Sequence, residues 1–259
     1  MAYQNLISEI RENILYVTIN REKALNALNR ATLAELADVV VFANKTAEVR
    51  GVILTGAGEK AFVAGADIKE FSDYTGEQGE ELARTGQINV FDAIEKSTKP
   101  FVAAINGFAL GGGLELAMAC HMRVAADTAK LGLPEVTLGL IPGYGGTQRL
   151  TQLVGKGKAI ELITTAGMIT ASEALKIGLL NHTVAQADLI AKAEEILNLI
   201  KQRAPLAVAA AIKSVNASIN EDNGFQVEIA EFGKCFETND FKEGVSAFVD
   251  KRKASFKGN

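Results

Sequence analysis

The sequence has few of the residues that usually build disulfide frameworks and metal centres. Its 259 residues include two cysteines, Cys120 and Cys235, and two histidines, His121 and His182. The cysteines show no paired spacing, and the histidines lie too far apart along the chain to form a local ligand pair. We therefore expect no disulfide framework and no metal site, and both cysteines should be reduced thiols with structural roles.

An excess of positive charge is also lacking. The 27 lysines and arginines are outnumbered by 31 aspartates and glutamates, which gives a formal net charge of −4 at pH 7. Proteins that bind nucleic acids need a basic surface to neutralise phosphates. DNA and RNA are therefore not expected as partners.

No uninterrupted apolar segment is long enough to span a membrane. The longest apolar region, from Phe101 to Cys120, is broken by Asn106, several glycines and Glu115, whereas a spanning helix needs about 20 consecutive apolar residues. The N-terminal segment has no basic stretch that leads into an apolar one, as a secretory signal would. We expect no membrane partner, no secretory signal and a cytoplasmic location.

The early part of the chain predicts a strand, a helix and a second strand. The segment Ile14 to Ile19 alternates as a half-buried strand does, and Gly51 to Leu54 opens an apolar run typical of a buried strand. Between them, an apolar helical stripe is capped by Asn29. The stripe consists of Leu33, Leu36, Ala37, Val40 and Val41.

The same rhythm recurs further along. Pro100 to Ile105 predicts a strand, Leu114 to Cys120 a helix, and Met122 to Ala126 another strand. Hydrophobic residues make up 48% and charged residues 22% of the chain, which is typical of a folded globular protein. We therefore expect an α/β core with parallel strands.

After about Gly155 the strand signals fade, and the last third is expected to be all-helical. No flexible linker separates it, so it should pack on the core or on a neighbouring subunit. Asn239 and Asp240 are candidate caps of a final helix. Earlier helical segments are Lys158 to Thr165, Ser172 to Ile177 and Ala187 to Arg203, and the final helix should gather Phe241, Val245, Phe248 and Val249 on one face.

Three glycines, Gly111 to Gly113, lie between an apolar strand and the helix that follows. A helix N-terminus has unsatisfied N–H donors and a partial positive charge, and glycine lets an anion approach closely. The segment is therefore suited to hold a phosphate or an enolate oxygen. It fits a tight turn with close helix packing equally well, and the segment alone does not decide between the two.

Two carboxyl groups lie in apolar surroundings. Glu115 is in the first turn of the apolar helix, where contact with the helix N-terminus alone would explain it. Glu135 follows Pro134 inside another apolar stretch, where an unpaired charge is costly to bury. Two poorly solvated carboxyls together indicate an acid/base pair.

A third segment, Ala61 to Phe71, reads AFVAGADIKEF. Gly65 leaves an apolar strand just before Asp67 and Lys69. The backbone here is a candidate second donor for the same anion, and Asp67 is an equally good candidate for a helix cap. Spacing does not choose between these interpretations.

Together these segments resemble the crotonase, or enoyl-CoA hydratase, superfamily over nearly the whole chain. As a set the motifs are highly specific, whereas the glycine triplet alone would be weak. They are REKALNAL at Arg21 to Leu28, AFVAGADIKEF, INGFALGGGLELAMAC, PEVTLGLIPGYGGTQRL at Pro134 to Leu150, and FVDKRKASF near the C-terminus.

The resemblance implies an architecture and an assembly. Residues 1–195 should form a spiral of repeated ββα units that holds the active site, and residues 196–259 a helical C-terminal region for trimerisation. Homotrimers of the family commonly pair into homohexamers, as dimers of trimers.

The resemblance also implies which residues act. Glu115 and Glu135, separated by 135 − 115 = 20 positions, match the catalytic pair of the hydratases. The N–H groups of Ala66 and Gly112 match the oxyanion hole that holds the thioester oxygen. The positions expected to bind the substrate and its CoA are Lys23, Ala24, Leu25, Ala64, Ala66, Asp67, Ile68, Lys69, Gly111, Gly112, Pro134 and Gly143.

The implied reaction is reversible syn addition of water to trans-2-enoyl-CoA, giving 3-hydroxyacyl-CoA. Such a hydro-lyase would serve fatty-acid β-oxidation or short-chain acyl-CoA metabolism. Glu115 would activate the water that attacks C3, and Glu135 would deliver a proton to C2. No cofactor is expected apart from the CoA of the substrate, and no metal. Two rivals stay open: an enoyl-CoA isomerase, which needs one carboxylate, and a CoA-binding oligomer without turnover.

Three residues depart from the commonest family pattern: Lys23, near which proline is frequent, His121, and Tyr144 in IPGYGG. Tyr144 is the most consequential, because it replaces a small residue close in sequence to the expected acyl pocket. We hypothesise that it limits acyl length. A basic cluster near the C-terminus either reaches the phosphates of CoA or is simply solvated; it contains Lys251, Arg252, Lys253 and Lys257.

Overall fold

Ten strands form two sheets in the part of the chain that the computed structural model describes, residues 3–220 and 223–259. The larger sheet has the order β1-β2-β3-β5-β7-β10, and all neighbours except β1 and β2 are parallel. Its strands are β1 (Leu6–Arg11), β2 (Ile14–Ile19), β3 (Gly51–Gly56), β5 (Phe101–Ile105), β7 (Met122–Ala126) and β10 (His182–Val184).

The smaller sheet has the order β4-β6-β8-β9, with only β9 antiparallel to its neighbour. Its strands are β4 (Ala61–Val63), β6 (Phe108–Leu110), β8 (Lys130–Gly132) and β9 (Ile169–Thr170). Each of β3, β5 and β7 in the larger sheet is followed by β4, β6 or β8 in the smaller one, and then by a helix. The expected spiral of ββα units is confirmed.

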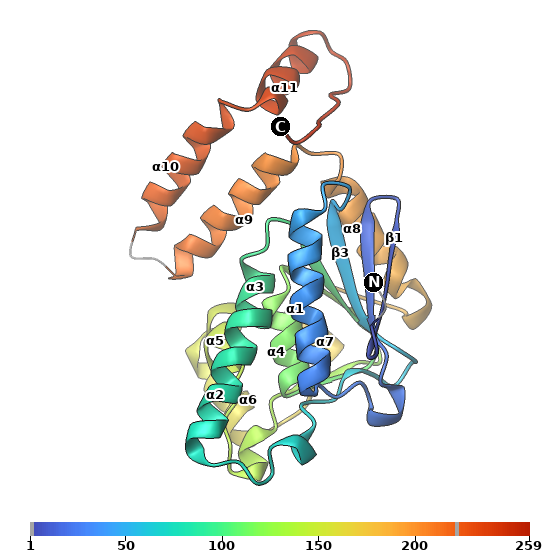
Figure 1. Cartoon of the computed structure of the whole chain (residues 1–259), viewed down its shortest axis with the longest axis vertical. Coiled ribbons are helices and arrows are strands. Elements are labelled where there is room, and N and C mark those ends of the chain that lie inside the picture. Colours follow the sequence, from blue (N-terminus) through green and yellow to red (C-terminus); the bar gives the residue numbers. More distant parts are fainter. Residues whose placement is uncertain (1–2, 221–222) are drawn as a thin grey trace.

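The helices after these pairs are α2 (Gly76–Gly86), α4 (Gly112–Ala119) and α5 (Gly146–Val154). A π-helical segment, Gln87–Phe91, joins α2 to α3 (Asp92–Glu95), so one continuous helix runs alongside α1 (Arg30–Lys45) in Figure 1. The remaining helices of the body are α6 (Lys156–Thr165), α7 (Ala171–Lys176) and α8 (Leu189–Ile200).

Both faces of the larger sheet are covered, as parallel sheets require. On one face, Ile53 and Val102 pack against Leu197 and its neighbours in α8. On the other, Val52 and Leu54 belong to the main core with α1 and α4. The alternation of side chains along β3 thus divides the core into two layers.

Helix α1 confirms the expected cap and most of the expected stripe. The side chain of Asn29 accepts a hydrogen bond from the Thr32 N–H (2.8 Å). Val41, however, is 51% exposed, and Val39 is buried instead. The buried face contains Leu36, Val39, Val40 and Ala43, because residues three and four apart share a helix face. Val41 lies beside that face.

The prediction that the last third is all-helical was wrong, because β9 and β10 lie there and extend the two sheets. Each has only two or three residues, too few for a visible alternation. The cap of the last helix also differs from expectation. The Thr238 hydroxyl accepts from the Phe241 N–H (3.0 Å), whereas Asp240 accepts from the N–H groups of Lys257 (2.7 Å) and Gly258 (2.8 Å).

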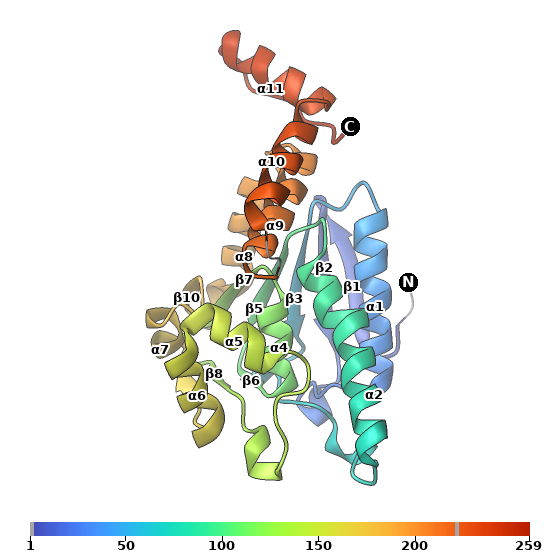
Figure 2. The same cartoon turned by 90° about the vertical axis from the view of Figure 1, so that its left-hand side faces the viewer.

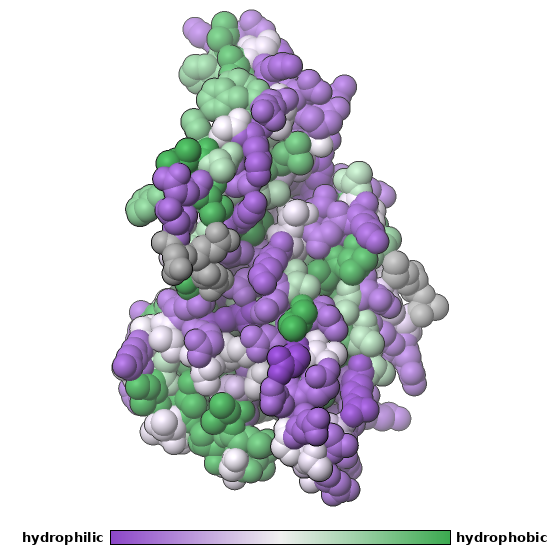
Figure 3. Space-filling model, turned by 60° about the vertical axis from the view of Figure 1, so that its left-hand side comes forward, coloured by the Kyte–Doolittle hydropathy of each residue, from purple (hydrophilic) through white to green (hydrophobic). Residues whose placement is uncertain are grey.

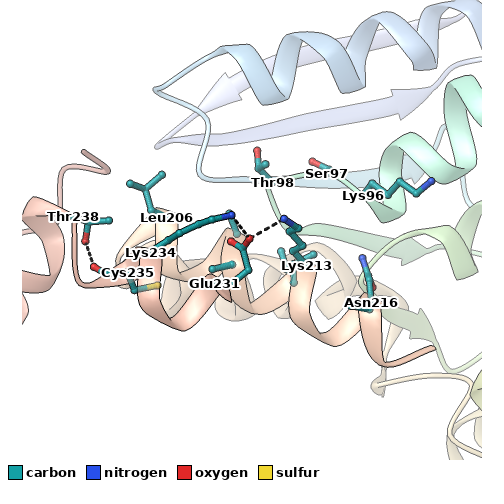
Figure 4. A pocket seen from close by; sticks show the side chains of 14 residues that line it. Lys96, Ser97, Thr98, Leu206, Lys213, Asn216, Glu231, Lys234, Cys235 and Thr238 are labelled. Atoms are coloured by element: carbon teal, nitrogen blue, oxygen red, sulfur yellow. Dashed lines mark hydrogen bonds and ion pairs between the residues drawn. The ribbon is translucent and has the colours of Figure 1, made fainter. Parts of the chain in front are cut away.

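Three helices, α9 (Pro205–Asn220), α10 (Gly224–Cys235) and α11 (Asn239–Val249), form an arm that stands away from the two-sheet body (Figures 1 and 2). Glu231 of α10 accepts from Lys213 of α9 and from Lys234, each at 2.8 Å, and all three residues line a cavity of about 570 Å³ between the arm and the body (Figure 4). The boundary expected between residues 195 and 196 falls inside α8, which packs on the sheet.

Large hydrophobic side chains of the arm face outward in the single chain. Phe225 is 81% exposed, Phe232 67% and Phe248 85%, and Figure 3 shows hydrophobic residues gathered on the arm and at the opposite end of the molecule. In the described part of the chain, no helix combines the length and the apolar character needed to cross a bilayer.

Candidate active site

Helix α4 begins at the glycine triplet and is packed against β4 by main-chain atoms. Gly111 precedes the helix at φ +51°, a conformation that favours glycine. A Cβ on Gly113 would overlap the carbonyl oxygen of Val63 in β4. The glycines therefore serve the close packing that one interpretation predicted, and they also leave the Gly112 N–H at the first position of the helix, where it has no intrahelical acceptor.

The Ala66 N–H faces the same space. The bridge between this segment and Leu28 uses the Gly65 carbonyl, which accepts from the Leu28 N–H (2.9 Å), and the Asp67 N–H, which donates to Leu28 O (2.7 Å). The Ala66 N–H between them points the other way. A Cβ on Gly112 would lie 3.8 Å from Ala66 N. Within residues 3–220 and 223–259, neither N–H donates to a protein acceptor.

An ion pair holds the Ala66 segment, and two buried amides hold residues 56–61 before it. Asp67 does not cap the short helix after it; its carboxylate pairs with Arg21 (3.0 Å). The Asn26 side chain donates to the carbonyls of Ala57 and Ala61, and Asn106 donates to those of Gly56 and Gly58. Sequence reasoning missed both roles, because a buried asparagine bonded across 31 or more residues leaves no local pattern.

Glu115 is 1% exposed, and its carboxylate is bound away from its own helix N-terminus. Its Oε1 accepts from the N–H groups of Tyr144 (2.8 Å) and Gly146 (2.7 Å), in the turn that leads into α5. Burial raises its pKa to about 7, and the nearby charge of Glu135 adds to the rise, while the two N–H donors oppose it. Contact with the helix N-terminus therefore does not account for its position.

Glu135 is the first residue of a 3-10 turn, Glu135–Leu138, directly after Pro134. Its Oε2 is buried and has no hydrogen-bond partner among the described residues. Its Oε1 would lie 2.8 Å from a Cβ on Gly111, so the carboxyl group rests against the glycine triplet. Burial raises the pKa of Glu135 as well.

One cavity of about 300 Å³ brings these groups together. Both glutamates and both N–H residues line it, and Phe71, Leu82, Ile141 and other apolar side chains complete its walls. Of the other positions expected to bind substrate, the cavity is lined by Ala64, Ile68, Gly111, Pro134 and Gly143.

The other expected CoA-binding residues lie beside the cavity and do not line it. Leu25 is connected to the wall through its carbonyl, which accepts from the Ala64 N–H (3.1 Å), and Lys23 and Ala24 precede it in an exposed 3-10 turn. Asp67 is held by Arg21, and Lys69 is exposed.

Sequence reasoning missed Arg149, which supports the turn that binds Glu115. Its side chain is 7% exposed and contacts Asp92 and Glu95 of α3, each at 2.6 Å, while Nη1 donates to the Tyr144 carbonyl (2.9 Å). The Tyr144 ring stacks on Phe91 with centroids 4.7 Å apart. An arginine in an amphipathic helix gives no signal of such burial, because both partners come from an earlier segment.

Cys120 and His121, directly after α4, have structural rather than catalytic surroundings. Cys120 is a buried free thiol whose pKa burial raises to about 12. His121 Nδ1 accepts from the Phe101 N–H (2.9 Å), and burial lowers its pKa to about 4. No three His, Cys, Asp or Glu side chains gather to hold a metal ion in the ranges that the structure covers.

The basic tail folds back on α11 in the single chain. Arg252 pairs with Glu243 through both terminal nitrogens (2.7 and 2.9 Å), and the Ser255 N–H donates to the same carboxylate (2.8 Å). Whether the tail contacts CoA in a neighbouring subunit stays a prediction.

Comparisons with known proteins agree with one another. The family model for enoyl-CoA hydratase/isomerase matches residues 9–259. The chain is similar to the crotonyl-CoA hydratase of Syntrophomonas wolfei, with 46% identity over 258 residues that cover 99% of both chains. It is 48% identical to the short-chain-enoyl-CoA hydratase of Clostridium acetobutylicum, covering 98% of this chain and 97% of that one.

Solved structures are similar in fold over the same extent. A crystal structure of enoyl-CoA hydratase from Bacillus anthracis superposes with a TM-score of 0.92 at 42% identity, covering 99% of this chain and all of that one. One from Geobacillus kaustophilus gives 0.93 at 35% identity, covering 99% of each chain.

Proposed function

The chain belongs to the enoyl-CoA hydratase/isomerase family, and from this premise we propose that it is a hydro-lyase that adds water reversibly to trans-2-enoyl-CoA thioesters. The product is a 3-hydroxyacyl-CoA. The names of two relatives, crotonyl-CoA hydratase and short-chain-enoyl-CoA hydratase, support short acyl chains, as in short-chain acyl-CoA metabolism or the last cycles of fatty-acid β-oxidation.

Two main-chain donors stabilise the charge that develops in this reaction. When water attacks C3 of the conjugated thioester, electron density moves to the thioester oxygen. The N–H groups of Ala66 and Gly112, which have no protein acceptor among the described residues, are suited to receive that oxygen. Removing one such donor from an oxyanion hole typically costs about 10²- to 10³-fold in rate. The CoA moiety would extend from Ala66 past Ile68 and Lys69 toward Lys23, whose exposed ammonium can meet a phosphate.

The two glutamates divide the proton transfers. In hydration, Glu115 accepts a proton from the water that attacks C3, and Glu135 delivers a proton to C2 on the same face, which gives syn addition. Dehydration reverses both roles. Both carboxyls have raised pKa values, and the charge of Glu135 raises the pKa of Glu115, so the pair holds one proton more readily than two charges.

One observation carries the proposal: two desolvated carboxyls share a single cavity with two N–H groups that have no acceptor within the described part of the chain. The direct test follows the absorbance of crotonyl-CoA, which falls as its conjugated double bond is hydrated. We expect turnover without added cofactor and its loss in Glu115→Gln. A protein that binds crotonyl-CoA but leaves its absorbance unchanged, or that converts only 3-enoyl-CoA to 2-enoyl-CoA, would contradict it.

We also propose that the arm assembles the protein into homotrimers, which pair into homohexamers. Support comes from the apolar side chains that the arm leaves exposed in the single chain, such as Phe225, Phe232 and Phe248, since exposed apolar surface of this kind marks interfaces. Light scattering of the purified protein measures the mass directly. A monomer at micromolar concentration would contradict this assignment. The cytoplasmic location stays a prediction.

A further inference from the structure

A further cavity lies on the other side of α2 from the active site. It has a volume of about 400 Å³ and runs between α1 and the helix formed by α2 and the π-helical segment. We call it the α1–α2 groove. Leu33, Ala34 and Ala37 line it from α1, and Leu82, Gly86 and Val90 line it from the other side.

Only a thin wall separates this groove from the catalytic cavity. Leu82 lines both spaces. Next to it, the ring of Tyr144 lines the catalytic cavity and touches Gly86, which lines the groove: a Cβ on Gly86 would overlap that ring. Leu82, which lines both spaces, and Tyr144, whose ring rests on Gly86, therefore form part of the wall between them.

Side-chain packing holds Tyr144 more firmly than Leu82 in this wall. Tyr144 is 7% exposed and stacked on Phe91, so its ring is fixed. It lies against Gly86, directly before the π-helical segment Gln87–Phe91, and against Phe91, the last residue of that segment. Such segments are often found at functional sites. Leu82 is only half-buried and stands in the regular part of α2, so it is the part of the wall that can be shortened without disturbing the core.

The orientation of the substrate aims its acyl chain at this wall. On the proposed function, the N–H groups of Ala66 and Gly112 would hold the thioester oxygen, and the CoA would lie on the side of Leu25 and Ala64. C3 must lie near Glu115, whose carboxylate is bound by the Tyr144 N–H (2.8 Å). The chain beyond C3 therefore continues toward Tyr144 and Leu82.

We propose that the wall of Leu82 and Tyr144 sets the upper length of the acyl chain, and that the α1–α2 groove is the space into which a longer chain extends once Leu82 is shortened. The proposal rests on the proposed function. It goes beyond the sequence-based hypothesis for Tyr144, because it adds Leu82 and names where the added carbons go.

The test compares kcat/KM for 2-decenoyl-CoA and crotonyl-CoA in the unaltered protein and in Leu82→Ala. One methylene in an apolar pocket changes discrimination by about 10- to 200-fold, so we expect the decenoyl-to-crotonyl ratio to rise by at least tenfold. Alanine is a good helix former, so Leu82→Ala should keep α2 intact. If it does unfold, Leu82→Val replaces it in the test and should give a smaller rise. An unchanged ratio in both variants overturns the proposal.

A second substitution tests the destination of the chain. Ala34 is exposed on α1 and lines the groove, so Ala34→Phe in the Leu82→Ala protein should remove most of the gain. Val41→Phe, on α1 but outside the groove, should keep it. A gain that survives Ala34→Phe overturns the groove as the destination. Failure of the unaltered protein to hydrate crotonyl-CoA would instead reject the proposed function, so the two failures are distinct.

Discussion

The two glutamates of the cavity are held in opposite ways. Glu115 is enclosed, and two backbone N–H groups fix one of its oxygens. Glu135 sits in a 3-10 turn, and one of its oxygens is buried with no partner among the described residues. The contrast suits their proposed tasks, because a base that orients water needs a fixed direction, whereas an acid that passes a proton needs a free oxygen to carry it.

Removal of either carboxyl is the strongest challenge to this contrast. Positioned proton transfer contributes roughly 10²- to 10⁴-fold, and we expect Glu115→Gln and Glu135→Gln each to lower kcat for crotonyl-CoA by that amount. The effects of residues that act as a unit are not additive, so kcat of the double variant should be only slightly lower than kcat of the less active single variant. Near-normal activity in either single variant would contradict the assignment of roles.

Two glycine substitutions separate the positions of the acids from their chemistry. A Cβ on Gly146 would lie 2.8 Å from Glu115 Oε1, and one on Gly111 would lie 2.8 Å from Glu135 Oε1. Misplacement by about 1 Å can cost about 100-fold, so Gly146→Ala and Gly111→Ala should each lower kcat by up to that factor.

Gly146→Ala should lower kcat more than Gly111→Ala, because the carboxylate of Glu115 has no room to turn away from the added Cβ. Gly111→Ala adds strain at a positive φ, so its thermal unfolding is measured alongside. Gly157→Ala, with nothing within 4 Å of the added Cβ, is the control and should leave kcat unchanged. Equal losses in all three variants would mean that the contacts with the acids do not matter.

Arg149 tests whether the support of Glu115 reaches beyond its two donors. Arg149→Lys keeps the charge but cannot contact Asp92, Glu95 and the Tyr144 carbonyl at once. We expect a lower melting temperature and a fall in kcat of about tenfold, well below the effect of losing an acid. Arg84→Lys, in an exposed pair with Glu80, should change neither. A lower melting temperature with normal kcat would assign Arg149 to stability alone.

The smallest effect concerns pH. The pKa of Glu115 is raised to about 7, and a base must be ionised, so kcat/KM for hydration should fall as the pH drops below about 7. In Glu135→Gln the neighbouring charge is gone, and the midpoint of this fall in the residual activity should move to lower pH. A midpoint that stays in place would show that the two carboxyls do not interact.

The dependence of stability on pH tests the raised pKa of Glu115 independently of activity. A carboxyl with a raised pKa in the native state contributes stability below its unfolded value of about 4.5, and that contribution is lost as the pH rises toward 7. In the unaltered protein, the urea concentration at the midpoint of unfolding should therefore decline as the pH rises from about 4.5 to 7. In Glu115→Gln the decline should be weaker.

Local patterns predicted the elements that carry the site. The alternation of Ile14 to Ile19 matches β2 residue for residue, and the cap at Asn29 and the strand Met122 to Ala126 are confirmed. These features are local, because strand alternation and helix capping depend on residues within a few positions of each other. Strands β9 and β10 were missed, because two or three residues at a sheet edge owe their conformation to the neighbouring strand.

The motifs also named the residues of the cavity, but not what holds them. Apolar neighbours of Glu115 indicated a desolvated carboxyl. Its donors, however, are main-chain groups 29 and 31 positions away, brought into place by Gly145 at φ +91°. A main-chain donor leaves no trace in the identity of its residue, so this contact could not be predicted from sequence. The burial of Arg149 was hidden for a similar reason, because its partners lie in α3.

The contact between Gly113 and the Val63 carbonyl has a practical meaning for redesign of this catalyst. The close approach of Gly113 to Val63 sets the spacing between α4 and β4, and with it the place of the Gly112 N–H, one of the two donors proposed to bind the thioester oxygen. Libraries that randomise wall positions such as Phe71, Leu138 and Ile141 can therefore search for new substrates while the reaction centre keeps its geometry. Libraries that touch residues 111–113 should consist mostly of inactive clones.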